Sequence, residues 1–162
     1  MTIERRIAAL FRMDDAAWAR HANPWSGWTR VATGFPLIIL AVWSRVWIGW
    51  WAILPVAATM IWLWLNPRLF PPPASTENWM SQGVLGERLW LNRDKRPIPQ
   101  HHHLVPHVLS AIAATAGLAV VYGLVVLDAV VTISGALVAM LAKMWFIDRM
   151  VWIYRDMCRS RD

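Results

Sequence analysis

The sequence is poor in cysteine and lacks the short motifs of the common soluble enzymes. Its one cysteine, Cys158, has no partner within the chain, so an internal disulfide is excluded. No glycine-rich phosphate loop, no GxSxG turn and no CxxC pair occurs in the sequence. These absences argue against the common classes of soluble enzyme. Because Cys158 lies in a basic C-terminal stretch, we expect that stretch to face a reducing compartment.

Charged residues are scarce and mostly basic. They make up 16% of the chain against 57% apolar residues, and the net charge is +6. This composition indicates an integral membrane protein. We attribute the basic excess to orientation in a membrane and attraction to membrane lipids, since no nucleic-acid-binding pattern occurs and no nucleic-acid partner is expected. Residues 1–20 contain no continuous apolar run, so we predict no signal peptide and expect the first spanning helix to direct insertion.

Two long apolar runs, 31–65 and 104–147, dominate what is present. Each exceeds the roughly 20 residues that cross a bilayer as one helix, so each should contain two helices. The first run is interrupted at Ser44 and Arg45, and the second at Asp128, whose carboxylate can cap the following helix. We predict an all-α, polytopic membrane protein that forms a single domain, with four transmembrane helices in two hairpins. The predicted spans are 29–45, 47–65, 104–127 and 129–149.

Basic residues lie almost entirely outside the apolar runs. They gather near both termini and in the connection 66–103, whereas the two hairpin tips share only Arg45. The positive-inside rule then places both termini and the connection in the cytoplasm, with the chain in the inner membrane. The connection should be a structured cytoplasmic loop. Residues 3–18 have an amphipathic pattern and should form a helix that lies on the membrane surface.

The third and fourth predicted spans each carry a stripe of small residues four apart, a spacing that lets helices approach closely. We favour packing within the bundle, and a homo-oligomer or a larger membrane complex stays open as the alternative. Thirteen tryptophans lie mostly near the two predicted membrane boundaries, where indole prefers to sit. The stripes are Thr115, Ala119 and Gly123 in the third span, and Gly135, Ala139 and Lys143 in the fourth.

The cytoplasmic boundary also gathers arginines, asparagines and a lysine. Arginine and lysine pair with phosphate and carboxylate groups, and asparagine supplies directed hydrogen bonds. We predict a cytoplasmic cap that binds an anionic ligand, either a lipid headgroup or a phosphate-bearing molecule. Glu87 should pair with an arginine, and Lys143 should either reach water or pair inside the bundle. The predicted ligand-binding residues are Asn23, Asn66, Arg68, Arg88, Asn92, Arg93, Lys143 and Arg149.

A second hypothesis is a membrane enzyme that acts on a lipophilic substrate. Its catalytic residues would be His21, Glu87 and Asp148, although Asp148 should also pair with an arginine of the connection. The histidines before the third span could hold a metal, with solvated histidines as the alternative. A third hypothesis is a small transporter or an accessory subunit of a membrane complex. The predicted metal ligands are His101, His103 and His107, and the sequence identifies no cofactor.

Four strings of tryptophan, proline and arginine at fixed places are distinctive: HANPWSGWTR, NPRLFPPP, GERLWLNR and KMWFIDRMVW. Together they resemble DUF6653, an uncharacterised family of small prokaryotic membrane proteins, over nearly the whole chain. The resemblance implies no activity, cofactor or catalytic residue. It does imply that the polar groups at the cytoplasmic boundary belong to one site.

Overall fold

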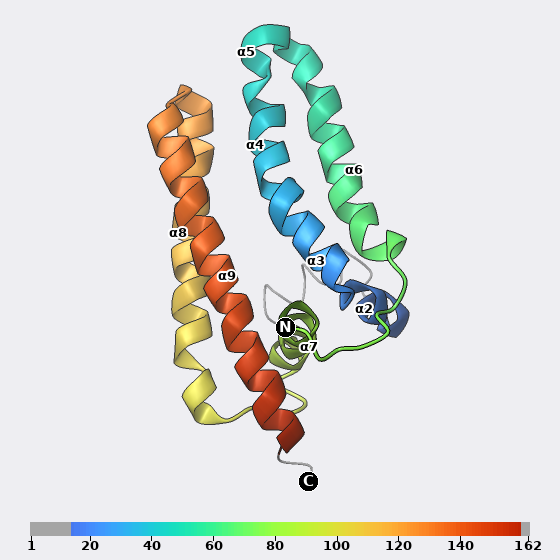
Figure 1. Ribbon diagram of the computed structural model, residues 1–162. Helices are drawn as coiled ribbons and strands as arrows, with labels where there is room; N and C mark the ends of the chain where they lie inside the picture. Colours follow the sequence, from blue (N-terminus) through green and yellow to red (C-terminus); the bar gives the residue numbers. More distant parts are fainter. Residues whose placement is uncertain (1–13, 160–162) are drawn as a thin grey trace.

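The computed structural model describes residues 14–159 and consists of helices, with no strand in that part of the chain. The predicted all-α class is confirmed. Figure 1 shows two pairs of long helices beside each other, which we call the first pair (α4 and α6) and the second pair (α8 and α9). The α-helices are α2 (Asp15–His21), α3 (Pro24–Thr29), α4 (Phe35–Trp43), α5 (Arg45–Ile48), α6 (Ile53–Leu69), α7 (Trp79–Leu91), α8 (Leu104–Val126) and α9 (Ala129–Arg159).

The segment Pro24–Leu69 is helical almost throughout, but it folds back on itself. The reversal occurs at Gly49, whose φ of 54° is a conformation that other residues rarely adopt. Just before α4 the five residues Arg30–Gly34 (η1) form a π turn. Pro36 explains this turn, because it has no N–H to donate and its ring crowds the preceding turn. The helix therefore has one wider turn that begins at Arg30, and the chain reverses its direction at Gly49.

The second pair follows the predicted pattern closely. Helix α8 ends one residue before the predicted end, at a left-handed Leu127. The Asp128 carboxylate then accepts a hydrogen bond of 3.0 Å from a backbone N–H in the first turn of α9, so the predicted cap is confirmed. A methyl group on Gly123 would meet Thr132 of α9, and one on Gly135 would meet α8. These glycines let the two helices pack closely within the chain.

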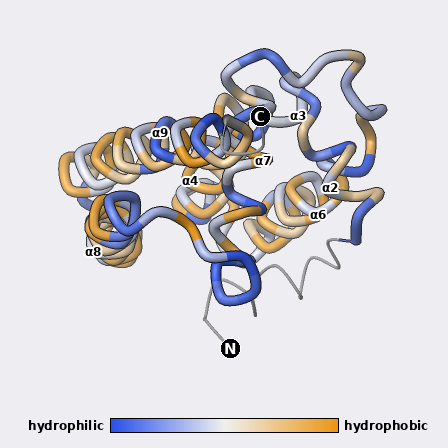
Figure 2. Tube along the Cα trace, turned by 90° about the horizontal axis from the view of Figure 1, so that it is seen from below, coloured by the Kyte–Doolittle hydropathy of each residue, from blue (hydrophilic) through white to orange (hydrophobic). Residues whose placement is uncertain are grey.

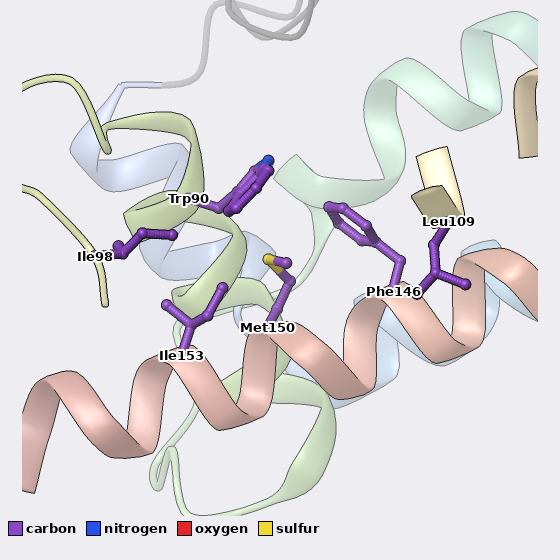
Figure 3. Close-up of a cluster of buried hydrophobic side chains, with 6 residues drawn as sticks. All are labelled: Trp90, Ile98, Leu109, Phe146, Met150 and Ile153. Carbon is purple, nitrogen blue, oxygen red and sulfur yellow. The ribbon is translucent and has the colours of Figure 1, made fainter. Parts of the chain in front are cut away.

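The core lies at the end of the molecule where α7 crosses beneath the pairs. Asn78 caps α7 by accepting a 2.9 Å hydrogen bond from the Ser81 N–H. Figure 3 shows Trp90 of α7 facing side chains of α9. Helix α9 continues ten residues past the predicted end at 149, because its next turns are buried there. The core cluster is Trp90, Ile98, Leu109, Phe146, Met150 and Ile153.

The opposite end, which we call the tip end, is exposed and apolar. It contains α5 and the short 3-10 turn Gly49–Ala52 (η2), where Trp50 is 96% exposed. Arg45 is held there by donating hydrogen bonds to the carbonyl oxygens of Leu124 and Val125 at the end of α8. Figure 2, seen from the α7 end, shows hydrophilic residues in the connections near the viewer and hydrophobic residues along the helices behind them. We call the near end, with α2, α7 and the connection 66–103, the polar end.

Three helical segments, rather than the predicted four, are long and apolar enough to cross a membrane: Pro24–Leu69, Gln100–Val126 and Ala129–Cys158. The difference lies in the first segment, because α5 and η2 fill the predicted break with helical turns. The predicted surface helix 3–18 lies mostly outside the described residues. Its last part differs from the prediction, since Asp14 is extended and caps a separate helix, α2, that begins at Asp15.

Candidate functional site

A cavity of about 690 Å³ lies between the two pairs and above α7. Its walls come from every long helix. Most of the lining is aliphatic or aromatic. The apolar lining includes Val31, Phe35 and Leu63 from the first apolar segment, Met80, Val84 and Trp90 from α7, and Leu109, Ala113, Met140 and Phe146 from the second pair.

Besides Ser110, four ionisable residues from four separate elements line this cavity, and we call them the cavity cluster: His21, Arg30, Glu87 and Lys143. Lys143 of α9 contacts Glu87 of α7, with 3.0 Å between Nζ and Oε1. Arg30 of η1 contacts His21 of α2, with 3.0 Å between Nη1 and Nε2. Two cations face one carboxylate, so with a neutral His21 the cluster carries a net charge of about +1.

The protonation of His21 follows from its partner. A guanidinium only donates hydrogen bonds, so Nε2 of His21 must accept, and the ring proton lies on Nδ1. Burial and then the charge of Arg30 lower the pKa of His21 from 6.5 to about 3, which keeps the ring neutral. His21 is 8% exposed, and its Nδ1 has no hydrogen-bond partner among the described residues. This N–H is enclosed by the surrounding side chains, and a buried N–H without a partner is costly.

Glu87 is held as a carboxylate. Burial alone would raise its pKa, but the charges of Lys143 and Arg30 and the hydrogen bond from Lys143 keep the pKa below its usual value. The side chain of Glu87 is 26% exposed and its oxygen pairs with a lysine, whereas the sequence predicts an arginine partner. A carboxylate with a lowered pKa is a weak base, so Glu87 acts here as the counter-ion of Lys143.

The predicted asparagines form internal braces. Asn66 is fully buried, accepts a 3.1 Å hydrogen bond from Ser26 and donates a 2.8 Å bond to Thr29. Asn23 donates to the Pro71 carbonyl at 2.9 Å. These bonds tie α3 to the end of α6 and so position η1, which carries Arg30. Both asparagines thus have a structural role, and their role as ligand contacts stays a prediction.

The predicted arginines lie outside the cavity lining and have partners within the chain. Arg88 pairs with Asp15, and Arg149 pairs with Asp148 at 2.7 Å. The other two lie over indole rings, with centroid distances of 4.1 Å for Arg68 on Trp64 and 4.3 Å for Arg93 on Trp90, and Asn92 donates to the Arg88 carbonyl. Of the eight predicted ligand-binding residues, Lys143 alone lines the cavity.

Asp148 does not join His21 and Glu87. Its carboxylate accepts a 3.2 Å hydrogen bond from the Trp79 indole and pairs with Arg149, the next residue in the chain. The predicted arginine partner from the connection 66–103 is therefore wrong, because Arg149 is a nearer cation on the same helix. The predicted catalytic set is reduced to its two cavity members, and Arg30 is the cluster member that the prediction omits.

The histidine tract is divided between two surroundings. His103 and His107 face the Trp90 ring, with centroid distances of 6.1 and 5.0 Å. His101 and His102 instead face Asp156 near the end of α9. The predicted set His101, His103 and His107 therefore does not converge. The group whose ligand atoms do converge is His101, His102 and Asp156.

These features define an all-α protein with three apolar segments able to cross a membrane and a largely apolar cavity between helix pairs. The chain belongs to the family of unknown function DUF6653, whose sequence model matches residues 2–162. Neither a curated protein nor a solved structure matches the chain significantly.

Proposed function

We propose that the protein binds a lipophilic anion in the cavity between its helix pairs. The observation that carries the proposal is the cavity cluster: a net positive group drawn from four elements faces largely apolar walls. The cavity volume of about 690 Å³ lies within the roughly 300–1,000 Å³ typical of small-molecule sites. An apolar chain would lie along the walls, and a carboxylate or phosphate headgroup would contact Arg30, while Lys143 stays paired with Glu87.

The charge of the cluster favours an anion over a cation or a neutral ligand. Glu87 offsets only one of the two cations, so one positive charge is left beside apolar walls, where Arg30 is half-buried and the Lys143 side chain is 48% exposed. A partly buried charge without a counter-ion is unfavourable, and a bound anion would reduce that cost. Arg30 also donates from Nε to the Ser26 carbonyl at 3.0 Å, which fixes the guanidinium and leaves further N–H groups to donate.

The proposal includes a membrane setting. The protein would be a multi-pass protein of the inner membrane, with the segment Pro24–Leu69 crossing twice and each pair forming a hairpin. Both termini and the connection 66–103 would be cytoplasmic, because basic residues lie at the polar end and Arg45 is the basic residue of the tip end. The cavity cluster would then lie near the cytoplasmic boundary, where the headgroups of lipids are found.

A membrane enzyme built on His21, Glu87 and Asp148 has weaker support. Nε2 of His21 is engaged by Arg30, and Asp148 lies in a separate contact with Trp79 and Arg149. A transporter or accessory subunit remains a hypothesis from the sequence, without a structural feature that favours it. Binding is therefore the function that we propose.

The test uses full-length protein purified in mild detergent, incubated with radiolabelled oleate, lysophosphatidate or oleyl alcohol. We expect the two anions to be retained and the alcohol to be retained at least tenfold less, with the two anionic arms distinguishing a carboxylate from a phosphate headgroup. Arg30→Gln should abolish the difference, because it removes the net charge while its amide can still donate to His21.

The matched control is Arg68→Gln, which removes an arginine outside the cavity lining. It should leave retention of the anions within about twofold of the wild type. Equal retention of oleate and oleyl alcohol by the wild type would contradict the proposal. Equal loss in both arginine variants would also contradict it, since it would indicate a general attraction of anions to a basic surface.

A further inference from the structure

The end of the connection 66–103 meets the end of α9 at a cluster of side chains that lies outside the cavity lining. The 3-10 turn Gln100–His102 (η3) lies against the last turns of α9. Nε2 of His102 lies 2.8 Å from Oδ2 of Asp156, and Nε2 of His101 lies 3.5 Å from the same oxygen. One ligand atom from each of these three residues can be chosen so that the three atoms lie within 4.8 Å of one another.

We propose that His101, His102 and Asp156 bind one divalent transition-metal ion of the Zn²⁺ class. Two imidazoles and one carboxylate are a donor set that such ions prefer. Ligand atoms about 2.0–2.1 Å from a tetrahedral zinc lie about 3.3 Å from each other, by geometry. The two measured separations, 2.8 and 3.5 Å, lie on either side of that distance.

A simple ion pair does not explain why two successive histidines face the same carboxylate oxygen. In a 3-10 turn, successive side chains point about 120° apart, because each turn contains three residues. Here the rings of His101 and His102 are 4.1 Å apart between centroids, and both turn toward one oxygen. The side chain of His101 is 67% exposed, so burial does not hold it in this position.

The exposure of the three ligands indicates an open site. His102 is buried and fixes the position, whereas Asp156 is one-third exposed and His101 faces solvent. An ion bound by these three side chains would keep at least one coordination position for a water molecule. Its effect would be to fasten the end of the connection 66–103 to the end of α9. The core residues Ile98 and Ile153 lie beside this junction, so the bound ion would stabilise the polar end.

The experiment uses the full chain purified without a His-tag, stripped with a chelator and then titrated with Zn²⁺ or Co²⁺. We expect one ion per chain by elemental analysis, visible absorption of the Co²⁺ form typical of four-coordination, and a higher thermal midpoint with metal than without. His101→Gln, at the most exposed ligand, should weaken binding at least tenfold without changing the midpoint of the metal-free protein. Asp156→Asn should weaken binding similarly.

The matched controls are His103→Gln and His107→Gln, from the same tract but facing Trp90. Both should bind Zn²⁺ as the wild type does. The proposal is overturned if the wild type binds no stoichiometric metal, if His101→Gln binds as tightly as the wild type, or if the control variants lose as much affinity. Because His101 is exposed, failure to fold would not explain a loss in that variant.

Discussion

The cavity and the surface of the polar end contain the same kinds of side chain in opposite circumstances. On the surface, Arg88 and Arg149 each face a carboxylate, and Arg68 and Arg93 lie over indole rings. In the cavity, two cations share one carboxylate, and a buried histidine N–H has no partner among the described residues. The comparison teaches that the number of arginines in a region does not locate a binding site. The local balance of charge does.

Substitutions at two glycines should have the largest effects. One glycine, Gly86, lies in the close packing of the polar end, and the other, Gly117, faces the open space of the cavity. A methyl group on Gly86 would overlap the Met150 carbonyl of α9, so Gly86→Ala should push α7 away and lower the stability by about 1–3 kcal/mol or more. Gly117 lines the cavity with nothing within 4 Å of an added methyl group. Gly117→Leu should therefore keep the fold and remove at least tenfold of the oleate affinity by filling the cavity.

The measurements are the thermal midpoint in detergent and oleate retention for each variant. Gly117→Ala is the matched control, because it adds one carbon to the same open space. It should leave both quantities near those of the wild type. If Gly117→Leu retained oleate fully while folding normally, the ligand would not occupy the cavity.

The ion pair of the cluster tests whether net charge or a particular cation attracts the ligand. Lys143→Gln alone reduces the net charge of the cluster from about +1 to 0 and leaves Glu87 without its partner, so oleate affinity should fall about tenfold or more. Lys143→Gln with Glu87→Gln restores the net charge of about +1 through Arg30 and should recover most of the affinity. The measurement is the equilibrium binding of oleate to the single and double variants, which distinguishes an effect of net charge from a specific contact with Lys143. A double variant as weak as the single one would make Lys143 a specific contact instead.

The pH dependence of stability should reveal His21. Its pKa is lowered to about 3 in the folded chain, so between pH 6.5 and 3 the unfolded chain binds the extra proton and folding is disfavoured. Stability from this residue is fully present above pH 6.5 and declines on acidification by at most about 1.4 kcal/mol per pH unit. The lowered pKa of Glu87 acts in the same direction, but only below about pH 4.5.

The measurement is the thermal midpoint of the wild type and of His21→Gln between pH 7 and 5, where Glu87 is not yet involved. The wild type should lose stability over this interval, and His21→Gln should lose much less, because glutamine does not titrate. His107→Gln, a change at an exposed histidine, should keep the decline of the wild type. Parallel curves for wild type and His21→Gln would show that His21 is not buried as a neutral ring.

Much of the fold can be predicted from local sequence patterns, whereas the cavity cluster cannot. Asp128 caps α9 as predicted, and the chain reverses near Gly49, within the predicted turn. Helix α9 runs past its predicted end because Met150 and Ile153 are buried against α7, a contact that periodicity within one helix does not reveal.

The cavity cluster illustrates the same limit. Its members come from α2, η1, α7 and α9, and only the tertiary packing decides that Lys143 pairs with Glu87 while Arg30 binds His21. Arg30 had one signal in the sequence, its position as the last charge before an apolar run. Asp156 had none, because it is far along the chain from the histidines that it contacts.

The most direct test of the central claim is to map where a photoreactive fatty acid attaches to the protein. With a diazirine near the end of the chain, we expect adducts on cavity-lining residues such as Ala113, Gly117 and Met140, and we expect oleate but not oleyl alcohol to suppress them. Arg30→Gln should remove these adducts. Adducts spread over outward-facing residues such as Leu118 and Val130, unaffected by oleate or by the variant, would contradict the account.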